Sequence, residues 1–546
     1  MQSQPDPRFY YLANFQQALT WLRERYADLL SESEQGFLRQ FAAMETASQA
    51  LLVRMIMRKG PHFRVSKLAY AEIGCTRLAA APLLDAGWIR NDAELPLEAL
   101  FSLLRKDELL EHLGDRPRQK TLKKSQLLEQ LAEVHAELRP FAAWCPGSDE
   151  QVLSLCIDPL CERLRLMFFG NLHQDWSEFV LAELGIFRYE PVPLTPDSRA
   201  FRHRADVDSY LQLQRSRERF EAGEPLASVL QQVSALACDT PFLAARRGKL
   251  LFRMGQHLER EADLEGALAF YADCRHGGAR LRRIRVLERL GRQAQAHALA
   301  SHAALEPEDD AEAQALERAL VRLGRQLGLP QPGKAKPVAP PRIDLRLPKP
   351  EAQSVEYAVK SHLSEPAGPV HYVENSLICS LFGLLCWEAI FAPVPGAFFH
   401  PFQSGPVDLL SADFHPRRAE RFAACLAHLD SEAYKQVIRQ NHGDKFGIQS
   451  PFVFWSALDQ PLLEQALDCL PAAHLRAWFT RLLRDIKANR AGMPDLIQFW
   501  PAERRYRMIE VKGPGDRLQD NQRRWLAFCA EHGMPVDVCY VQWAEA

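Results

Sequence analysis

Apolar residues recur at helical spacing along most of the chain. Between residues 10 and 57, stretches such as FQQALTWLRERYADLL place apolar side chains three and four positions apart, which is the period of one helix face. We therefore predict a helical N-terminal domain over residues 1–60. After it, HFRVSKL, a short helical stretch and LLDAGWIR predict a strand, a helix and a wing-like turn, the order of a winged-helix unit.

Two similar amphipathic segments follow, LLRKDELLEHLG and LKKSQLLEQLAEV, with the same leucine spacing. The pair resembles a SAP module, which docks on duplex DNA through basic residues at its helix starts. The candidates for that contact are Arg105, Lys106, Lys123 and Lys124. On these residues alone, a plain helical hairpin with its basic side chains in solvent is the alternative. We assign residues 61–145 to this winged-helix-like and SAP-like module.

The next part of the chain is helical and repeats itself. The segments LLFRMGQH, VLERLGRQ and ALVRLGRQ place Gly255, Gly291 and Gly324 at intervals of 36 and 33 residues, on either side of the tetratricopeptide period of about 34. We predict tetratricopeptide-like repeats within residues 146–329. Frequent prolines then predict a linker or extended strap over residues 330–353, and a last domain occupies residues 354–546.

Composition narrows the class of protein. A chain of 546 residues with 47% hydrophobic residues is expected to form several folded domains. The net charge is −2, so nucleic acid would have to be bound by local basic patches. The twelve cysteines form no CxxC pairs, which predicts reduced thiols rather than a zinc site or a secreted disulfide framework. The most apolar run carries Glu388 and is interpreted as a buried helix. We expect a soluble protein, cytoplasmic or associated with a nucleoid or nucleus, without a membrane partner.

A hairpin predicted near the C-terminus gathers ionisable side chains. The runs DLIQFW and YRMIEVK are separated by PAERR, which is typical of two paired strands. Because alternate side chains of a strand share a face, Glu510 and Lys512 point one way, while Ile509 and Val511 point the other way. We expect the core-forming apolar residues to be mostly segregated from the ionisable pair, and the hairpin to return Asp495 beside Glu510.

Such a set could hold a hard divalent cation. Two carboxylates supply the oxygen ligands that Mg²⁺ and Mn²⁺ prefer, and they leave positions open for water and a phosphate oxygen. For the Glu-x-Lys pair alone, a solvated strand face is the ordinary interpretation. The proline and aspartate of GMPDLIQFW upstream strengthen the functional hypothesis.

The order of elements around the hairpin points to a fold. Asp516 is expected to cap a helix through DRLQDNQRRWLAFCAEHG, closed by Gly533, and VDVCYVQW predicts another strand. Hairpin, helix and strand in this order resemble the α/β core of the PD-(D/E)xK, restriction-endonuclease-like nucleases. The candidate for a third carboxylate is Glu374, expected in the first turn of an apolar helix, where an interaction with the helix dipole is the alternative role.

Across nearly its whole length, the chain resembles the Fanconi-associated nuclease family, whose virus-type replication-repair nuclease domain belongs to the same group. The similar stretches include VENSLICSLFGLLCWEAIF, FQSGPVDLL, GMPDLIQFW and IEVKGPGDRLQDNQRRWLAF. The resemblance implies a multi-domain, mainly helical protein that acts on branched or flapped DNA. It implies structure-selective cleavage near 5′ flaps, 5′ to 3′ exonuclease activity and a role in interstrand crosslink repair. A DNA-junction-binding scaffold with a vestigial nuclease domain is the alternative function.

The resemblance also implies roles for single residues. Those implied to bind the Mg²⁺ or Mn²⁺ ion are Glu374, Asp495, Glu510 and, through its carbonyl, Val511. Lys512 is implied as the catalytic lysine, and Gln403 falls at a further active-site position.

Two features depart from the family pattern. The chain starts at the helical domain without the Cys and His pattern of the ubiquitin-binding zinc finger found in eukaryotic members. Asn521 stands where a further basic residue for a DNA 5′-phosphate is expected. The candidate basic residues near the nuclease motifs, four of them on the predicted helix AWFTRLLRDIKANR, are Arg481, Arg484, Lys487, Arg490 and Arg517.

Overall fold

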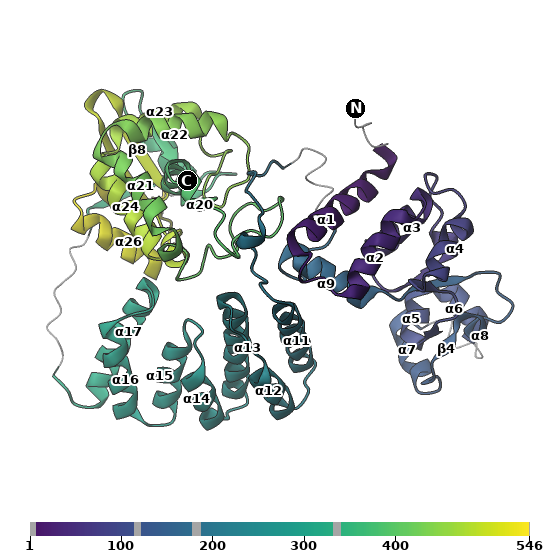
Figure 1. The fold of residues 1–546 in the computed structure, drawn as a ribbon. Helices are drawn as coiled ribbons and strands as arrows, with labels where there is room; N and C mark the ends of the chain where they lie inside the picture. Colours follow the sequence, from purple (N-terminus) through teal and green to yellow (C-terminus); the bar gives the residue numbers. More distant parts are fainter. Residues whose placement is uncertain (1–6, 114–121, 177–186, 331–339, 545–546) are drawn as a thin grey trace. The chain divides into compact units, whose positions relative to one another are not determined.

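The structure, a computed structural model, describes residues 7–113, 122–176, 187–330 and 340–544. The chain divides into two compact units (Figure 1). The first comprises Met1–Ile186 and Phe201–Val207, and the second comprises Phe187–Ala200 and Asp208–Ala546. Each unit is described by itself.

Helices open the first unit, as predicted. Those within residues 1–60 are η1 (Pro7–Phe9), α1 (Tyr10–Tyr26), α2 (Glu32–Ala43) and α3 (Thr46–Ile56). A further helix of this unit, α9 (Asp158–Phe169), comes from the segment predicted to form repeats. The first of the long helices, α1, packs on α3 and α9, and the buried rings of Phe15 and Phe41 meet edge to face. Ser31 caps α2 in a reciprocal capping box with Glu34, which satisfies backbone N–H groups that a helix start leaves without partners.

The segment predicted as a winged-helix unit forms strands and a helix, and its sheet contains a strand that comes from further along the chain. Its elements are β1 (His62–Arg64), η2 (Val65–Lys67), α4 (Thr76–Asp85), β2 (Ile89–Arg90) and β5 (Val152–Leu155). The central strand of the sheet is β5, which pairs antiparallel with β1 on one side and β2 on the other. The segment between β2 and β5 is therefore an insertion between two strands of this sheet.

That insertion contains the SAP-like helix pair together with short strands and helices that pack around it. The elements are β3 (Glu94–Leu95), α5 (Leu97–Leu103), α6 (Lys106–Leu113), α7 (Lys124–Ala132), β4 (Arg139–Pro140) and α8 (Phe141–Trp144). Leu109 of α6 and Leu127 and Leu131 of α7 are buried in one apolar cluster. The leucine repeat of the sequence therefore forms the core of this module.

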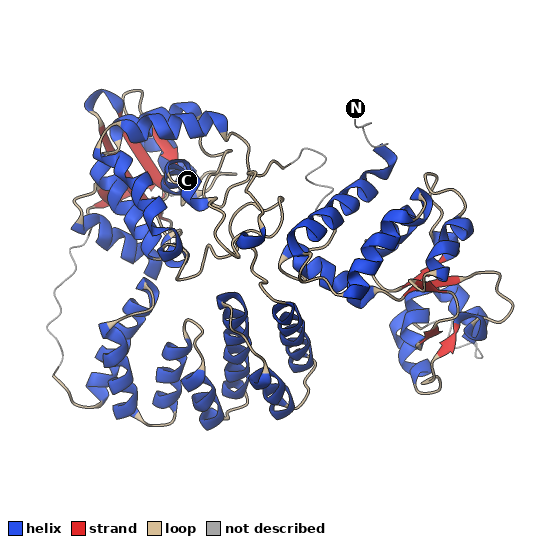
Figure 2. Cartoon of the chain, viewed as in Figure 1, coloured by secondary structure: helices blue, strands red, loops and turns tan. Residues whose placement is uncertain are grey.

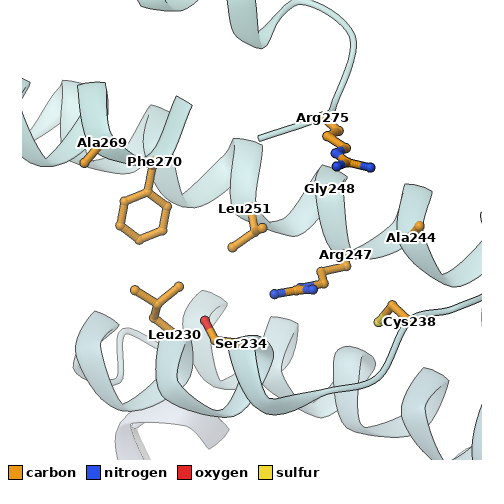
Figure 3. Close-up of a pocket in the computed structure, with 10 residues that line it drawn as sticks. All are labelled: Leu230, Ser234, Cys238, Ala244, Arg247, Gly248, Leu251, Ala269, Phe270 and Arg275. Atoms are coloured by element: carbon orange, nitrogen blue, oxygen red, sulfur yellow. The ribbon is translucent and has the colours of Figure 1, made fainter. Parts of the chain in front are cut away.

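The second unit begins with η4 (Pro196–Ser198) and a row of helices, drawn in teal in Figure 1. The helices are α11 (Arg204–Glu221), of which the part from Asp208 belongs to this unit, α12 (Leu226–Ala235), α13 (Pro241–Arg260), α14 (Leu264–Asp273), α15 (Ala279–Arg289), α16 (Gln293–Leu305) and α17 (Asp310–Gln326). From α13 to α17 each helix packs on the next one, which is the nearest-neighbour packing of a solenoid. A cavity of about 550 Å³ opens between α12, α13 and α14, with Leu230, Leu251 and Phe270 on its walls (Figure 3).

The three repeated glycines do not occupy equivalent positions. Gly255 lies within α13, where an added Cβ would come within 2.7 Å of the Tyr271 ring, so close helix packing requires glycine there. Gly324 lies within α17, whereas Gly291 follows α15 with a φ of 73°. The sequence repeat therefore reflects successive helix pairs, whereas the close contact that Gly255 makes is not repeated at Gly291.

A five-stranded sheet forms the centre of the C-terminal part. Its strands are β6 (Arg342–Leu347), β7 (Val370–Tyr372), β8 (Leu496–Trp500), β9 (Arg505–Lys512) and β10 (Val536–Trp543), in the order β6-β10-β9-β8-β7. The pairs β6–β10 and β10–β9 are parallel, and the other two pairs are antiparallel. The edge strand β6 comes from the segment expected to be a linker or strap, of which residues 331–339 lie outside the described part.

Helices cover both faces of this sheet (Figure 2). Their bounds are α18 (Val355–Leu363), α19 (Leu377–Leu385), α20 (Trp387–Ile390), α21 (Ala419–Ala427), α22 (Ala433–Asp444), α23 (Gln460–Cys469), α24 (Ala472–Arg484), α25 (Ile486–Asn489) and α26 (Asp520–Glu531), with short turns η5 (Pro416–Arg418), η6 (His428–Asp430) and η7 (Pro501–Glu503). Val359 of α18 packs on one face, and the large core of α19 to α24 and α26 packs on the other. Among the described helices, none is long and apolar enough to cross a membrane.

Three helix boundaries differ from the sequence predictions. The apolar run breaks at Cys386 into α19 and α20, and the basic helix breaks at Asp485 into α24 and α25. The last helix begins at Asp520 with Gln519 as its N-cap, because the Asp516 carboxylate accepts instead from the Gly513 N–H at 3.0 Å. Gly533, with a φ of 64°, follows the end of that helix as predicted.

Candidate active site

The hairpin of β8 and β9 places Asp495 opposite Glu510. Leu496 pairs with Ile509 in the antiparallel register, so the preceding residue on one strand faces the following residue on the other. The Val511 N–H donates to Asp495 Oδ2 at 2.8 Å. The juxtaposition expected from strand periodicity is therefore present.

The ionisable face of the hairpin is not segregated from the core, contrary to our expectation. Tyr506 and Met508 share the face of Glu510 and lie in the large apolar cluster, while Ile509 and Val511 lie in the cluster on the opposite face. Both faces are apolar because helices cover both sides of the sheet, as is usual around parallel strands. Glu510 is consequently only 1% exposed.

Glu510 uses one carboxylate oxygen and leaves the other without a hydrogen bond. The Lys512 Nζ lies 2.6 Å from Glu510 Oε1, and the Gln522 Nε2 donates to the same oxygen at 2.6 Å. Oε2 is buried and has no hydrogen-bond partner among the described residues. An ionised oxygen in that state is costly unless a cation or proton meets it.

Burial and neighbouring negative charges raise the pKa values of both carboxyls. Burial raises the pKa of Glu510 to about 8, with a further rise from the Asp495 charge, while Lys512 acts in the opposite direction. Burial also raises the pKa of Asp495 to about 6, against the opposing effects of the Val511 N–H and Lys512. The one ammonium beside them, Lys512, therefore does not compensate for the burial of two adjacent carboxyls.

Glu374 lies close enough to influence the pair but is differently placed from our expectation. It lies between β7 and α19, before the helix rather than in its first turn. Its charge contributes to the raised pKa values of Asp495 and Glu510. Its own oxygens accept from the Tyr372 hydroxyl at 2.5 Å and from the Asn375 Nδ2 at 3.2 Å.

The donor set fits a divalent cation in its chemistry. Carboxylate and carbonyl oxygens are the ligands of Mg²⁺ and Mn²⁺, and a cation would meet the unpartnered oxygen and the excess negative charge. Within the described ranges, no three His, Cys, Asp or Glu side chains lie close enough together to hold a metal ion. The hairpin therefore supplies a pair of carboxylates, with Glu374 beside it.

Gln403 holds its own loop together. Its Oε1 accepts from the N–H groups of Phe399 and His400 at 2.5 and 3.3 Å. Its Nε2 donates to the carbonyls of Ala397 and Gly405 at 3.4 and 3.2 Å. Each of these four contacts is to the backbone of residues 397–405.

The basic candidates of the nuclease part differ in their surroundings. Arg481 has a side chain only 11% exposed, and its guanidinium lies over the rings of Trp525 and Phe528. Arg484 is exposed and lies 3.3 Å from Asp310. Lys487 and Arg517 are exposed. Arg490 is half-buried and donates to the Pro451 carbonyl.

The basic candidates of the SAP-like module gather at the starts of α6 and α7. Arg105 precedes α6 directly, and Lys123 is the N-cap of α7; both are exposed. Lys106 is half-buried, and Lys124 donates to the Leu104 carbonyl at 2.7 Å. The two exposed side chains are therefore the ones that solvent or a ligand reaches most easily.

Sequence reasoning did not identify Gln522 or Tyr372. Gln522 lies in the first turn of α26 and reaches back to Glu510 on β9, and Tyr372 ends β7 beside Glu374. The only signal for Gln522 was its place in the first turn of the helix that follows the hairpin. Neither contact could be derived without knowing how α26 and β7 pack on the hairpin.

Three family models match the chain, in the order of the domains described above. They are the FAN1 HTH domain over residues 9–90, the Fanconi anemia-associated nuclease SAP domain over residues 94–144 and the VRR-NUC domain over residues 429–543. Helical N-terminal modules and a sheet-containing VRR-NUC domain define a multi-domain nuclease, which confirms the predicted fold class.

Relatives make the assignment specific. The chain is 58% identical to a Fanconi-associated nuclease 1 homolog of Pseudomonas aeruginosa over 540 residues, which cover 99% of this chain and 96% of the relative. A homolog of Arabidopsis thaliana is 25% identical, with 99% of this chain and 68% of the relative covered. The chain belongs to the Fanconi-associated nuclease family.

Solved structures agree with this assignment. The crystal structure of paFAN1 bound to 2-nt 5′-flap DNA with a gap matches with a TM-score of 0.91 at 57% identity, covering all of both chains. The complex of paFAN1 with 1-nt 5′-flap DNA with a gap matches with a TM-score of 0.88 at the same identity, covering 99% of this chain and 100% of that one.

Proposed function

We propose that this protein is a divalent-metal-dependent, structure-selective DNA endonuclease that cuts near 5′ flaps or branched junctions. The observation that carries the proposal is the hairpin site, where Asp495, Glu510 and Lys512 meet and Glu510 Oε2 is buried without a partner in the described structure. Support for the substrate comes from the paFAN1 chain, which is 57% identical and bound to 5′-flap DNA. The proposal includes 5′ to 3′ exonuclease activity and a role in interstrand crosslink repair.

The residues proposed to hold Mg²⁺ or Mn²⁺ are Asp495, Glu510, the carbonyl of Val511 and Glu374. The Glu374 side chain has to move toward the pair, because no three such side chains of the described residues lie close enough together in this structure. When bound, such an ion polarises the scissile phosphate and lowers the pKa of an attacking water. The Val511 N–H donates to the Asp495 carboxylate at 2.8 Å and so orients it. Gln403 holds its own loop, residues 397–405, through contacts to the backbone.

Lys512 supplies a fixed positive charge to the site. Its side chain is 9% exposed, and its Nζ lies 2.6 Å from Glu510 Oε1. A charge shielded from water acts on a nearby phosphate with less screening than a surface charge. Lys512 is therefore proposed to offset the negative charge that develops on phosphorus.

The test is cleavage of end-labelled 5′-flap, 3′-flap, nicked and single-stranded DNA with Mg²⁺, Mn²⁺ or a chelator. We expect cutting near the 5′ flap only with metal, and a loss of at least about 100-fold in Asp495→Ala, since one ligand and one charge are removed. The matched control is Asp537→Ala, which removes an aspartate of β10 that pairs with Arg507. Metal-dependent cutting that survives Asp495→Ala unchanged would contradict the site assignment.

The alternative function is a junction-binding scaffold. It is favoured by one observation, that both oxygens of Glu374 are already hydrogen-bonded to Tyr372 and Asn375. In that case the protein binds 5′-flap DNA in a salt-sensitive manner and cuts none of the four substrates with either metal.

A further inference from the structure

Gln522 connects the start of α26 to the candidate active site. Its Oε1 accepts from the backbone N–H of Gln519, the N-cap, at 2.8 Å. Its Nε2 donates to Glu510 Oε1 at 2.6 Å. Because the Gln519 N–H can be met only by the amide oxygen, the amide nitrogen of Gln522 has to face Glu510.

This contact decides which oxygen of Glu510 is available. Gln522 and Lys512 both bind Oε1, and Oε2 is left buried without a hydrogen bond to any described residue. A donor fixed by the helix cap therefore holds the carboxylate in one rotation. A carboxylate held through one oxygen presents the other to a ligand, as outer hydrogen-bond partners do for metal-binding residues.

The first turn of α26 is itself held in place on two further sides. Asp520 binds Arg318 of α17 through two contacts of 2.5 Å each. Asn521 packs against Gly492, where an added Cβ would lie 2.6 Å from the Asn521 amide nitrogen. Gly492 has a φ of 88°, so this approach to the segment before Asp495 requires glycine. Gln522 thus extends from a turn that is fixed before any ligand binds.

We propose that Gln522 is a positioning residue of the metal site: it fixes the Glu510 carboxylate so that Oε2 is presented to the divalent cation. The inference rests on the proposed function, because it concerns the same metal site. Gln522 itself touches neither metal nor DNA in this role. It acts through the orientation of Glu510.

Binding of Mn²⁺ to the full chain, followed by the electron paramagnetic resonance signal of free Mn²⁺, tests the inference apart from catalysis. Loss of an outer partner typically weakens metal affinity about 10- to 100-fold, and we expect a loss in this range for Gln522→Met. This variant keeps the length of the side chain and removes both hydrogen bonds. Gln522→Asn, whose shorter amide cannot reach both partners, is expected to show the same loss in a side chain that remains polar.

The matched control is Asp459→Ala, which removes the N-cap contact to the Leu462 N–H of α23 and does not touch Glu510. It is expected to lower the melting temperature as Gln522→Met does, with unchanged Mn²⁺ affinity. Wild-type affinity in both Gln522 variants, or an equal loss of affinity in the Asp459 control, would overturn the positioning role. If the wild type and Asp495→Ala bind Mn²⁺ equally weakly, the proposed function fails first, and the inference fails with it.

Discussion

Two buried glutamates of this chain have opposite pKa shifts, and the difference lies in their partners. Glu34 is buried, which alone would raise its pKa, but hydrogen bonds from Arg204 and Arg163 outweigh burial and lower it. Glu510 has one ammonium and one amide on a single oxygen, and its pKa is raised to about 8. The first is a completed structural ion pair. The second is a carboxyl whose single ammonium partner, Lys512, does not outweigh burial and the Asp495 charge, which is the pattern of a functional site.

The ion pairs of Glu34 predict a pH-dependent stability. The folded pKa of Glu34 lies below its unfolded value, so the stabilisation is present above the unfolded pKa and is lost as pH falls through the folded pKa. Glu34→Gln is expected to cost about 3 kcal/mol of unfolding free energy at neutral pH, since it leaves two guanidinium groups without their carboxylate. Urea unfolding at a series of pH values measures this difference.

The control is Glu32→Gln, a change at an exposed residue of the same helix turn, with an expected effect below about 0.5 kcal/mol. The difference between wild type and Glu34→Gln should shrink in acid. A difference that stays constant from neutral pH to about pH 3 would show that packing, and not the charge of Glu34, stabilises this part.

At the scale of elements, helix starts carry functional polar side chains both at the candidate active site and in the SAP-like module. The first turn of α26 carries Gln522 toward Glu510, and the starts of α6 and α7 carry exposed Arg105 and Lys123. A helix start offers free N–H groups and the positive end of the dipole, which favour anions such as phosphate. Exposed basic side chains at two adjacent helix starts therefore suit a DNA backbone.

We predict that Arg105→Gln combined with Lys123→Gln weakens binding to the duplex arms of a 5′-flap substrate. Each lost phosphate contact lowers the salt slope by about 0.9, so the slope of log K against log salt should fall by nearly 2. Fluorescence anisotropy over a range of salt concentrations measures it. The control, Arg90→Gln combined with Arg139→Gln, removes equal charge from arginines that lie on β2 and β4, outside the two helix starts. Equal slopes in both double variants would refute the assignment of the helix starts.

At the scale of the whole molecule, structure that depends on local sequence patterns could be predicted, whereas contacts between distant segments could not. The hairpin was predictable because its register depends on strand periodicity and a short turn, so Asp495 and Glu510 could be paired from the sequence. The pairing of β5 with β1 and of β6 with β10 could not be predicted, because in each pair the two strands lie far apart in the chain. Arg481 looked like a surface cation from its helix, yet Trp525 and Phe528 of α26 cover it.

Contacts between distant segments also join α17, the last helix of the solenoid, to the nuclease helices within the second unit. Asp310 lies near Arg481 and Arg484 and accepts from the Asn489 side chain at 3.1 Å, and it is mostly buried. Arg318 and Asp520 form a shorter ion pair, but both side chains are about half exposed. Water screens that second pair, and surface ion pairs typically contribute little stability.

Burial rather than distance should therefore decide which contact stabilises this junction. We expect Asp310→Ala to cost about 2 kcal/mol, because Arg481 loses its carboxylate in a place that water hardly reaches. Arg318→Ala, the matched change in the same helix, should cost less than about 1 kcal/mol. Melting temperatures and amide hydrogen exchange of α17 and α24 measure both effects, and a larger effect of Arg318→Ala would contradict the argument. If the expected order is observed, the solenoid is attached to the nuclease helices chiefly through Asp310.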